Sequence, residues 1–201
     1  MAVFNQEMKM STDFSKFRRE VANRQYEISD SGGIYLPKAK VMLGGVFEVD
    51  HIRDGKSLGT TRDHNIVVNE GLNHILSVVF NGGTQITTWY VGIFEGNYTP
   101  VATDTAANIT SNSTESTAYA EATRVAWVEA APSGQSITNS ASKATFTMNA
   151  TKTIYGAFLA SASAKSATTG TLMAASKFSA SRAVVNLDQL LLTYALSCSD
   201  A

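Results

Sequence analysis

This sequence has a single cysteine, almost no net charge and no long hydrophobic run. Each of these features excludes a class of protein. Cys198 is the only cysteine among the 201 residues, so the chain has no internal disulfide framework. The 16 Lys and Arg residues almost balance the 17 Asp and Glu residues, and a net charge of −1 gives no global attraction to nucleic acid or to an anionic membrane. The longest apolar stretches, ILSVVF and LDQLLLTYAL, are too short or too interrupted to span a bilayer.

The N-terminal residues MAVFNQEMKMSTDF also lack the basic and apolar regions of a secretory signal. We therefore expect a protein that is made in a cytoplasm and has no membrane partner.

The stretch DHIRDGKSLGTT contains Gly-Lys-Ser but lacks the rest of a phosphate-binding loop. Such a loop needs a glycine five residues before the glycine of its Gly-Lys pair, and here Asp50 holds that position, where its carboxylate would repel a phosphate. No helix pattern follows Ser57, although a phosphate site needs a helix N-terminus. Asp54-Gly55 is instead a strong two-residue turn signal between two strand patterns, which predicts a β-hairpin over residues 44–68.

Histidine is also scarce, and the three histidines are not spaced as in a zinc site. His51 and His64 lie about symmetrically around the predicted turn, so their rings could face each other across the hairpin. Two facing imidazoles can hold a metal, but most are ordinary cross-strand neighbours, and no third ligand is evident. We expect neither a metal nor another cofactor.

Acidic residues in the second half of the chain are scattered, one to each element or loop. That distribution favours solubility and edge protection over a paired acid and base, and no Gly-x-Ser-x-Gly motif is present. The sequence therefore predicts a protein that is not an enzyme. A glycan hydrolase remains the enzymatic alternative, and it would need a pocket that brings Glu121 and Glu129 to about 5.5–9.5 Å. Trp89 and Trp127 lie within strand patterns and are expected in the core or in an interface.

Residues 1–42 form a polar N-terminal arm in this interpretation. Within the arm, residues 12–24 have the pattern of a short amphipathic helix, because Phe14, Phe17 and Val21 recur on one side. An isolated helix of this length is marginal in water, so the apolar side needs a partner, either the body of the same chain or another chain.

The residues that we predict to bind a partner combine the aromatic and apolar side chains of the arm with its arginines: Phe14, Phe17, Arg18, Arg19, Val21, Arg24, Tyr26 and Tyr35. Arginines interleaved with aromatics also occur in nucleic-acid interfaces. Acidic residues are interspersed among them, however, and this weakens the case for nucleic acid.

Residues 43–201 have the pattern of a β-rich body with one good helix. The segment NEGLNHILSVVFNGG predicts that helix over residues 69–81, with Asn69 as its N-cap and Gly82-Gly83 at its end. Four apolar residues recur at helical spacing and form its core-facing side: Leu72, Ile75, Leu76 and Val79.

From residue 84 onward, short alternating segments are separated by small polar turns. Alternation such as Phe146/Met148 and Ile154/Phe158 predicts one buried face for each strand. GTLMAASKF and SRAVVN are interpreted as two strands, SASAKSATTG as a long hairpin loop, and residues 102–118 as a loop without core-forming residues. The fold class that we expect is mainly β, an antiparallel β-sandwich or jelly-roll-like body with one short amphipathic helix and an extended N-terminal arm.

The segment HNIVVNEGLNHILSVVFNGGTQITTWYVGIFEGNYTPVATDT combines N-x-V-x-x-x-G-L, W-Y-V-G-I-F and Y-x-P-x-x-x-D-T. This combination resembles a group of structural proteins from tailed bacteriophages. YAEATRVAW and GTLMAASKFSASRAVVNLDQLLLTYALS look like the same group, so the resemblance covers about residues 44–198. The motifs are moderately specific for the group, but they say little about the position in the particle, because similar segments also begin some tail-fibre proteins.

The resemblance implies a virion protein, since the group includes capsid decoration (cement) proteins, and it transfers no catalytic residues. The expected partners are the major capsid protein and further copies of the chain, as a dimer or trimer, on the outer surface of the capsid. Two other functions stay open: a tail or neck component, such as the particle-anchoring part of a tail fibre, and a surface carbohydrate-binding module.

Overall fold

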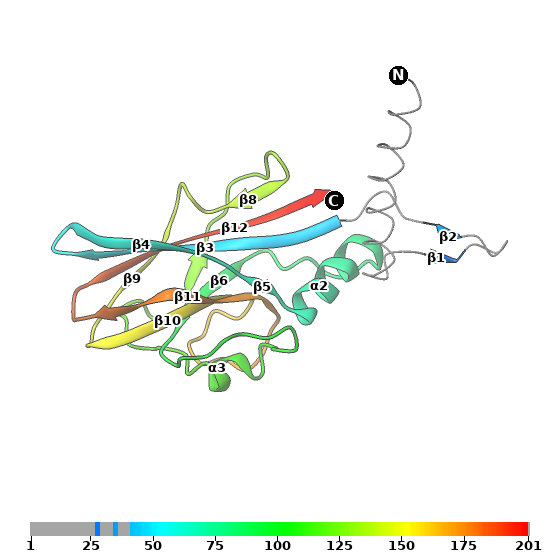
Figure 1. Ribbon diagram of the computed structural model, residues 1–201. Coiled ribbons are helices and arrows are strands. Elements are labelled where there is room, and N and C mark those ends of the chain that lie inside the picture. Colours follow the sequence, from blue (N-terminus) through cyan, green and yellow to red (C-terminus); the bar gives the residue numbers. More distant parts are fainter. Residues whose placement is uncertain (1–26, 29–33, 36–40, 201) are drawn as a thin grey trace, which may run out of the picture. The chain divides into compact units, whose positions relative to one another are not determined.

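A computed structural model describes residues 27–28, 34–35 and 41–200 (Figure 1). Most of the arm at 1–42, including the expected helix over 12–24, lies outside the described residues. Two short strands of the arm, β1 (Glu27–Ile28) and β2 (Ile34–Tyr35), pair with each other in antiparallel fashion. Residues Leu43–Cys198 form one compact unit, which we call the body.

Two antiparallel sheets build the body. Its strands are β3 (Val41–Arg53), β4 (Lys56–His64), β5 (Ile66–Val67), β6 (Trp89–Phe94), β7 (Val125–Trp127), β8 (Ser136–Thr138), β9 (Ala144–Thr147), β10 (Lys152–Ala160), β11 (Leu172–Val184) and β12 (Gln189–Asp200). The first sheet has the order β4-β3-β12-β8, and β9 also pairs with β12. The second sheet has the order β5-β11-β10-β6-β7. The prediction of a mainly β, antiparallel sandwich is confirmed.

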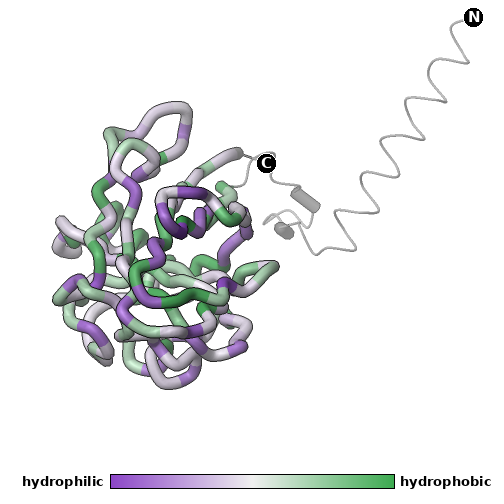
Figure 2. Tube along the Cα trace, turned by 90° about the vertical axis from the view of Figure 1, so that its left-hand side faces the viewer, coloured by the Kyte–Doolittle hydropathy of each residue, from purple (hydrophilic) through white to green (hydrophobic). Residues whose placement is uncertain are grey.

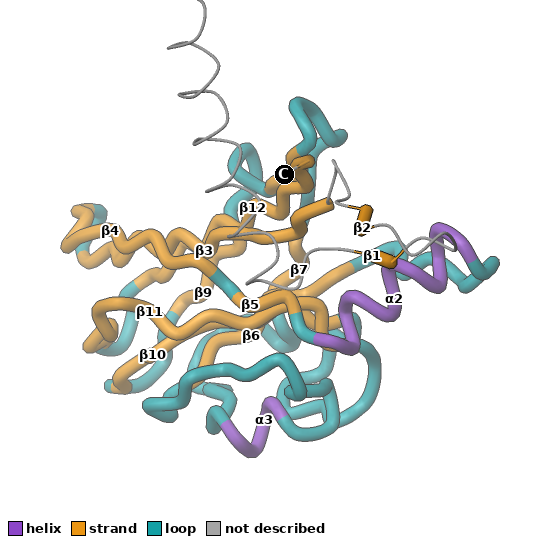
Figure 3. Tube along the Cα trace, turned by 45° about the vertical axis from the view of Figure 1, so that its right-hand side comes forward, coloured by secondary structure: helices purple, strands orange, loops and turns teal. Residues whose placement is uncertain are grey.

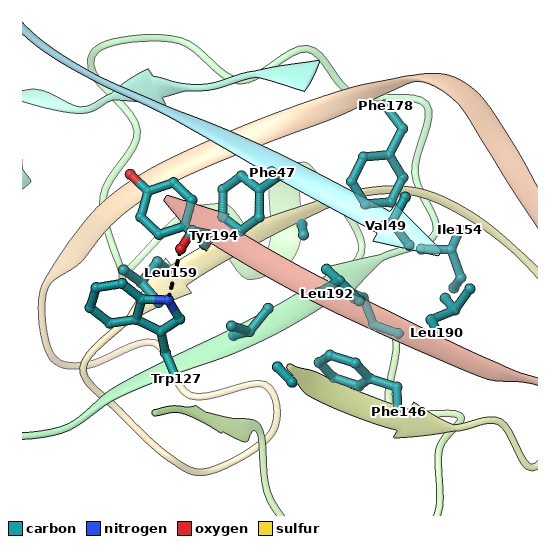
Figure 4. Packing of buried hydrophobic residues seen from close by; sticks show 14 of the residues in the cluster. Phe47, Val49, Trp127, Phe146, Ile154, Leu159, Phe178, Leu190, Leu192 and Tyr194 are labelled. Carbon is teal, nitrogen blue, oxygen red and sulfur yellow. Dashed lines mark hydrogen bonds between the residues drawn. The ribbon is translucent and has the colours of Figure 1, made fainter. Parts of the chain in front are cut away.

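The main core lies between the two sheets (Figure 4). Phe47 of β3 stacks on Tyr194 of β12 with 4.4 Å between ring centroids, and the indole N–H of Trp127 donates to the backbone carbonyl of Tyr194 at 3.2 Å. Trp89 and Trp127 are both buried, as the strand patterns predicted. Coloured by hydropathy, the hydrophobic parts of the chain gather in the interior of the body, whereas hydrophilic residues occupy its loops (Figure 2).

The second sheet is buried on both faces. Its outer face is covered by the segment after β6, which contributes Ala106 and Ile109 to a second apolar cluster with Phe94 and Phe158. The expectation that residues 102–118 hold no core-forming residues is therefore wrong. These residues also contain a short helix, α3 (Ile109–Asn112).

The predicted hairpin is present as β3 and β4, with Arg53 opposite Lys56. Asp54 and Gly55 both have positive φ, 49° and 73°, which is the backbone of a tight hairpin turn that matches strand twist. The hairpin ends at His64, whereas we predicted that it continues to residue 68. The chain crosses at this point into the other sheet, where β5 pairs with β11.

Strand β10 contradicts the expectation that Ile154 and Phe158 share one buried face. Ile154 belongs to the core between the sheets, whereas Phe158 belongs to the second apolar cluster. The pairing of β10 with β11 shifts between Ile154 and Gly156, and such a bulge turns the following side chains to the opposite face.

The same irregularity explains β11, which runs continuously from Leu172 to Val184 where we predicted two strands. Between Lys177 and Arg182, β11 has more residues than the paired part of β10, and the strand continues through this bulge. The small polar residues of the bulge look like a turn in the sequence. The loop over SASAKSATTG does connect β10 and β11 as a hairpin loop, as predicted.

Candidate interaction surface

The helix α2 (Asn69–Phe80) lies at the rim of the body, after β5 and outside both sheets (Figure 3). Its apolar side is not the buried side. The exposed fractions are 38% for Leu72, 55% for Leu76, 63% for Val79 and 81% for Phe80. The prediction that this stripe faces the core is therefore wrong for Leu72, Leu76 and Val79, while Ile75 is half-buried against the core. We call Leu72, Leu76, Val79 and Phe80 the α2 face.

Gly71 decides which side of α2 meets the sheet. It is the buried residue of the helix, and a Cβ added at this position would lie 2.6 Å from the carbonyl oxygen of Met173 in β11. Only a residue without a side chain allows the helix and the strand to approach so closely. The α2 face lies about a quarter-turn or more away from Gly71 and consequently points outward.

Glu70 fixes α2 in this orientation. One oxygen, Oε2, accepts hydrogen bonds from the backbone N–H of Ala106 at 2.8 Å and of Leu172 at 2.7 Å. The single acidic side chain of the helix thus joins three segments of the body and does not belong to the exposed face. His74 is half-buried beside it, and its ring lies edge-on to that of Trp89 with 5.7 Å between centroids.

The ends of α2 agree only partly with the predicted caps. Val68, not Asn69, occupies the N-cap position, and it provides no side-chain hydrogen bond. The N–H of Asn69 instead donates to the carbonyl of Ala102 at 2.8 Å. The predicted end is confirmed, since Gly82 has a φ of 65° and the N–H of Gly83 donates to the carbonyl of Ser77.

The motif Y-x-P-x-x-x-D-T builds a loop that is held together by hydrogen bonds. Asp104 is buried, and its carboxylate accepts hydrogen bonds from the Tyr98 hydroxyl at 2.8 Å and from the Val101 N–H at 2.9 Å. Burial of Tyr98, with the hydrogen bond to Asp104, raises the pKa of the Tyr98 phenol above its ordinary value. The motif residues therefore hold the segment that covers the outer face of the second sheet.

A buried ion pair joins Glu115 to Arg124. Both side chains are 1% exposed, and the guanidinium donates to both carboxylate oxygens at 2.7 and 2.8 Å. Arg124 also donates to the carbonyls of Ala162 and Ala167, which lie in the long β10–β11 loop. Sequence patterns missed this pair, because its residues lie in irregular segments where no periodicity marks burial.

Lys165 in the same long loop packs over the ring of Tyr119, with its ammonium 3.7 Å from the ring centroid. It donates to the carbonyl of Tyr119 at 2.8 Å. Burial lowers the pKa of Lys165, and burial raises the pKa of Tyr119 above its ordinary value. All of these contacts fasten the loop to the body.

Asp188 forms another polar cluster, at the turn between β11 and β12. Its carboxylate accepts hydrogen bonds from Arg53 at 2.7 and 2.8 Å and from the Val185 N–H at 2.8 Å. His51 lies 2.7 Å away through Nε2. The hydrogen bond from Arg53, helped by those from Val185 and His51, holds the pKa of Asp188 well below its usual range.

The histidine pair considered as metal ligands is not formed. In the hairpin, His51 is opposite Gly59 and His64 is opposite Val46, so the two rings do not face each other. Within residues 27–28, 34–35 and 41–200, no group of three or more His, Cys, Asp or Glu residues is arranged to hold a metal.

The two carboxylates named for a hydrolase have separate environments. Glu121 is half-buried and accepts a hydrogen bond from the Thr147 N–H, whereas Glu129 is exposed.

In the described part of the chain, no helix is both long and apolar enough to cross a membrane.

The structure describes one of the predicted partner-binding residues. Tyr35 lies in β2, opposite Glu27 of β1. The others lie outside the described residues: Phe14, Phe17, Arg18, Arg19, Val21, Arg24 and Tyr26. The structure thus adds the α2 face as a candidate surface, although three of its residues, Leu72, Leu76 and Val79, were predicted to face the core.

A scan against protein-family models found no match, and a search of curated proteins found no relative of the chain. The resemblance to bacteriophage structural proteins stays a prediction.

Proposed function

We propose that the chain is a non-enzymatic capsid decoration (cement) protein of a tailed bacteriophage. It binds across junctions between major capsid subunits on the outer surface of the virion, after synthesis in the host cytoplasm. Its partners are the major capsid protein and further copies of the chain, and it needs no cofactor.

The observation that carries the proposal is the α2 face, an apolar helix surface left exposed on an otherwise well-packed body. Exposed apolar residues gathered on one helix favour a protein–protein contact. The bacteriophage assignment is supported separately, by the motif combination over residues 44–198. The structure gives that combination a physical meaning, because Gly71, Tyr98 and Asp104 build the joint between helix, loop and sheet.

The mechanism is the burial of apolar surface across a junction that internal DNA pressure tends to open. At about 25 cal/mol per Å², a standard interface of roughly 1,600 Å² supplies ample free energy for stable attachment in many copies. In this proposal the arm extends to a neighbouring subunit, and its apolar residues, among them Phe14 and Phe17, bind there. The sandwich supplies a rigid body that carries the arm.

The direct test is binding of the purified chain to capsids assembled without it, measured as the copies that sediment with each major capsid subunit. We expect stoichiometric binding of the full chain and loss of binding when residues 1–42 are deleted. Replacing Phe14, Phe17 and Val21 by alanine should have the same effect as the deletion, whereas Ser15→Ala, outside the apolar stripe, should bind normally.

Two outcomes would contradict the proposal in different ways. If the truncated chain fills all capsid sites, the arm has no role in attachment. If each particle holds only a few copies, confined to the tail axis, the chain is a tail or neck component and not a decoration protein.

A further inference from the structure

The α2 face has the composition of an interface centre. Leu72, Leu76, Val79 and Phe80 are spaced by four, three and one residues, so their side chains share one stripe about 100° wide. The helix contains no Lys or Arg, and its only acidic residue, Glu70, is bonded inside the body. Depletion of charged residues, together with an aromatic residue such as Phe80, is typical of the buried part of a protein interface.

The size of the α2 face fits a small symmetric contact. At the exposed fractions given above, the four side chains present on the order of 400 Å² of apolar surface, or about 800 Å² for two copies. The polar side chains of Asn69 and Asn73, exposed on the same helix, extend the total to about 1,000 Å², the lower limit of specific interfaces.

The absence of charge also indicates which partner fits. An uncharged apolar stripe that runs along the whole helix is complementary to itself, because no like charges meet when two copies pack in antiparallel orientation. Such a contact obeys a two-fold axis, in which each residue meets the same patch on the other copy. A foreign partner that was selected by charge would require complementary charges, which this helix does not carry.

We propose that the α2 face pairs with the α2 face of a second copy and forms a two-fold dimer. The centre of the stripe, at Leu76, lies next to the two-fold axis, so the two Leu76 side chains meet. A contact of this small size is expected to be weak, with a dissociation constant in about the micromolar range. On a capsid, where many copies lie side by side, such weak contacts reinforce attachment through avidity.

This inference deepens the proposed self-association of the chain, but its test needs no capsid. Sedimentation equilibrium of the full chain over about 1–200 µM should show a monomer–dimer equilibrium. Leu76→Glu places two carboxylates at the axis and should raise the dissociation constant at least about 100-fold. Leu58→Glu is the matched control, because Leu58 is equally exposed, at 52%, in the β3–β4 hairpin, and should leave the equilibrium unchanged.

A second measurement keeps the proposal testable if the glutamate variant folds poorly. In a Cys198→Ser background, Leu76→Cys should form a disulfide-linked dimer under mild oxidation, and Leu58→Cys should not. A full chain that stays monomeric at 200 µM, or a dimer that Leu76→Glu does not weaken, overturns the α2 contact. A chain that dimerises through α2 but does not bind capsids contradicts the proposed function alone, and the reverse result contradicts this inference alone.

Discussion

Arg124 is the largest side chain in the fully buried interior, and its charge is neutralised by Glu115 at 2.7 Å. Removing one member of such a pair leaves the other charge buried and uncompensated. Arg124→Ala also leaves the carbonyls of Ala162 and Ala167 without this donor. We expect the variant to lower the free energy of unfolding by about 3–5 kcal/mol, measured by urea denaturation.

The control for that prediction is the ion pair between Lys152 and Glu95, whose side chains are 38% and 21% exposed. Water screens this pair and the side chains lose entropy to form it, so Lys152→Ala should change the free energy of unfolding by less than about 1 kcal/mol. Equal losses for Arg124→Ala and Lys152→Ala would show that burial does not distinguish the two pairs.

Asp188 makes the stability of the fold depend on pH. Because Arg53, Val185 and His51 lower its pKa in the folded state below the ordinary value of 3.8, folding favours the charged form. The stabilisation is complete above the unfolded-state pKa and is lost as the pH falls through the folded-state pKa. Asp188→Asn should lower the free energy of unfolding by roughly 2–3 kcal/mol at pH 7.

The difference between the native chain and Asp188→Asn should shrink as the pH falls below about pH 4, where Asp188 begins to be protonated in the unfolded chain. Thermal unfolding at a series of pH values measures it. A difference that does not shrink below about pH 4 would mean that Asp188 is not held in its charged form.

At the scale of the element, the joint between α2 and β11 reverses a general rule. An alanine in place of glycine within a helix normally stabilises it by about 1 kcal/mol. At Gly71 the added methyl group would meet the backbone of Met173 at 2.6 and 2.8 Å, and a backbone atom cannot move aside as a flexible side chain does. Gly71→Ala should therefore destabilise the body by about 1–3 kcal/mol.

Asn73→Ala is the matched control in the same helix, since Asn73 is exposed and alanine has the higher helix propensity. This variant should leave the unfolding midpoint unchanged or raise it slightly. If Gly71→Ala also raises the midpoint, α2 does not pack on β11 as closely as the structure places it.

Local patterns predicted those elements whose signal lies within a few residues. Asp54-Gly55 identified the hairpin turn, and Gly82-Gly83 identified the end of α2. Periodicity also located the helix itself, but not which side is buried. That choice depends on Gly71 meeting Met173, a contact between residues about 100 positions apart in the chain, and no local pattern records it.

The remaining errors have the same origin. A bulge in the β10–β11 pairing moves Ile154 and Phe158 to opposite faces, although their spacing suggests a shared face. Ile109 is buried in a segment rich in Ser, Thr and Asn, because Asp104 accepts the hydrogen bonds that fold this segment onto the sheet. The α2 face was missed as a candidate surface because the apolar stripe of the helix was assumed to face the core. The contact between Gly71 and Met173 turns another side of the helix to the sheet.

At the scale of the whole molecule, the main core is shared by both sheets. Phe47 and Tyr194 come from the first sheet, and Ile93 and Leu159 come from the second, yet all four belong to one buried cluster. Each sheet needs the other to bury the apolar side chains of its inner face. The two sheets should therefore unfold together in one cooperative transition.

The arm should contribute little to that transition, because residues Leu43–Cys198 form a compact unit with its own core. Deleting residues 1–42 should leave the urea midpoint of the body within experimental error of the full chain. Trp89 and Trp127, both in the body, report the transition by fluorescence. A deletion that shifts the midpoint strongly would mean that the arm belongs to the folding unit, and loss of capsid binding by the truncated chain would then reflect damage to the body. An unchanged midpoint, combined with lost binding, assigns the attachment to the arm itself.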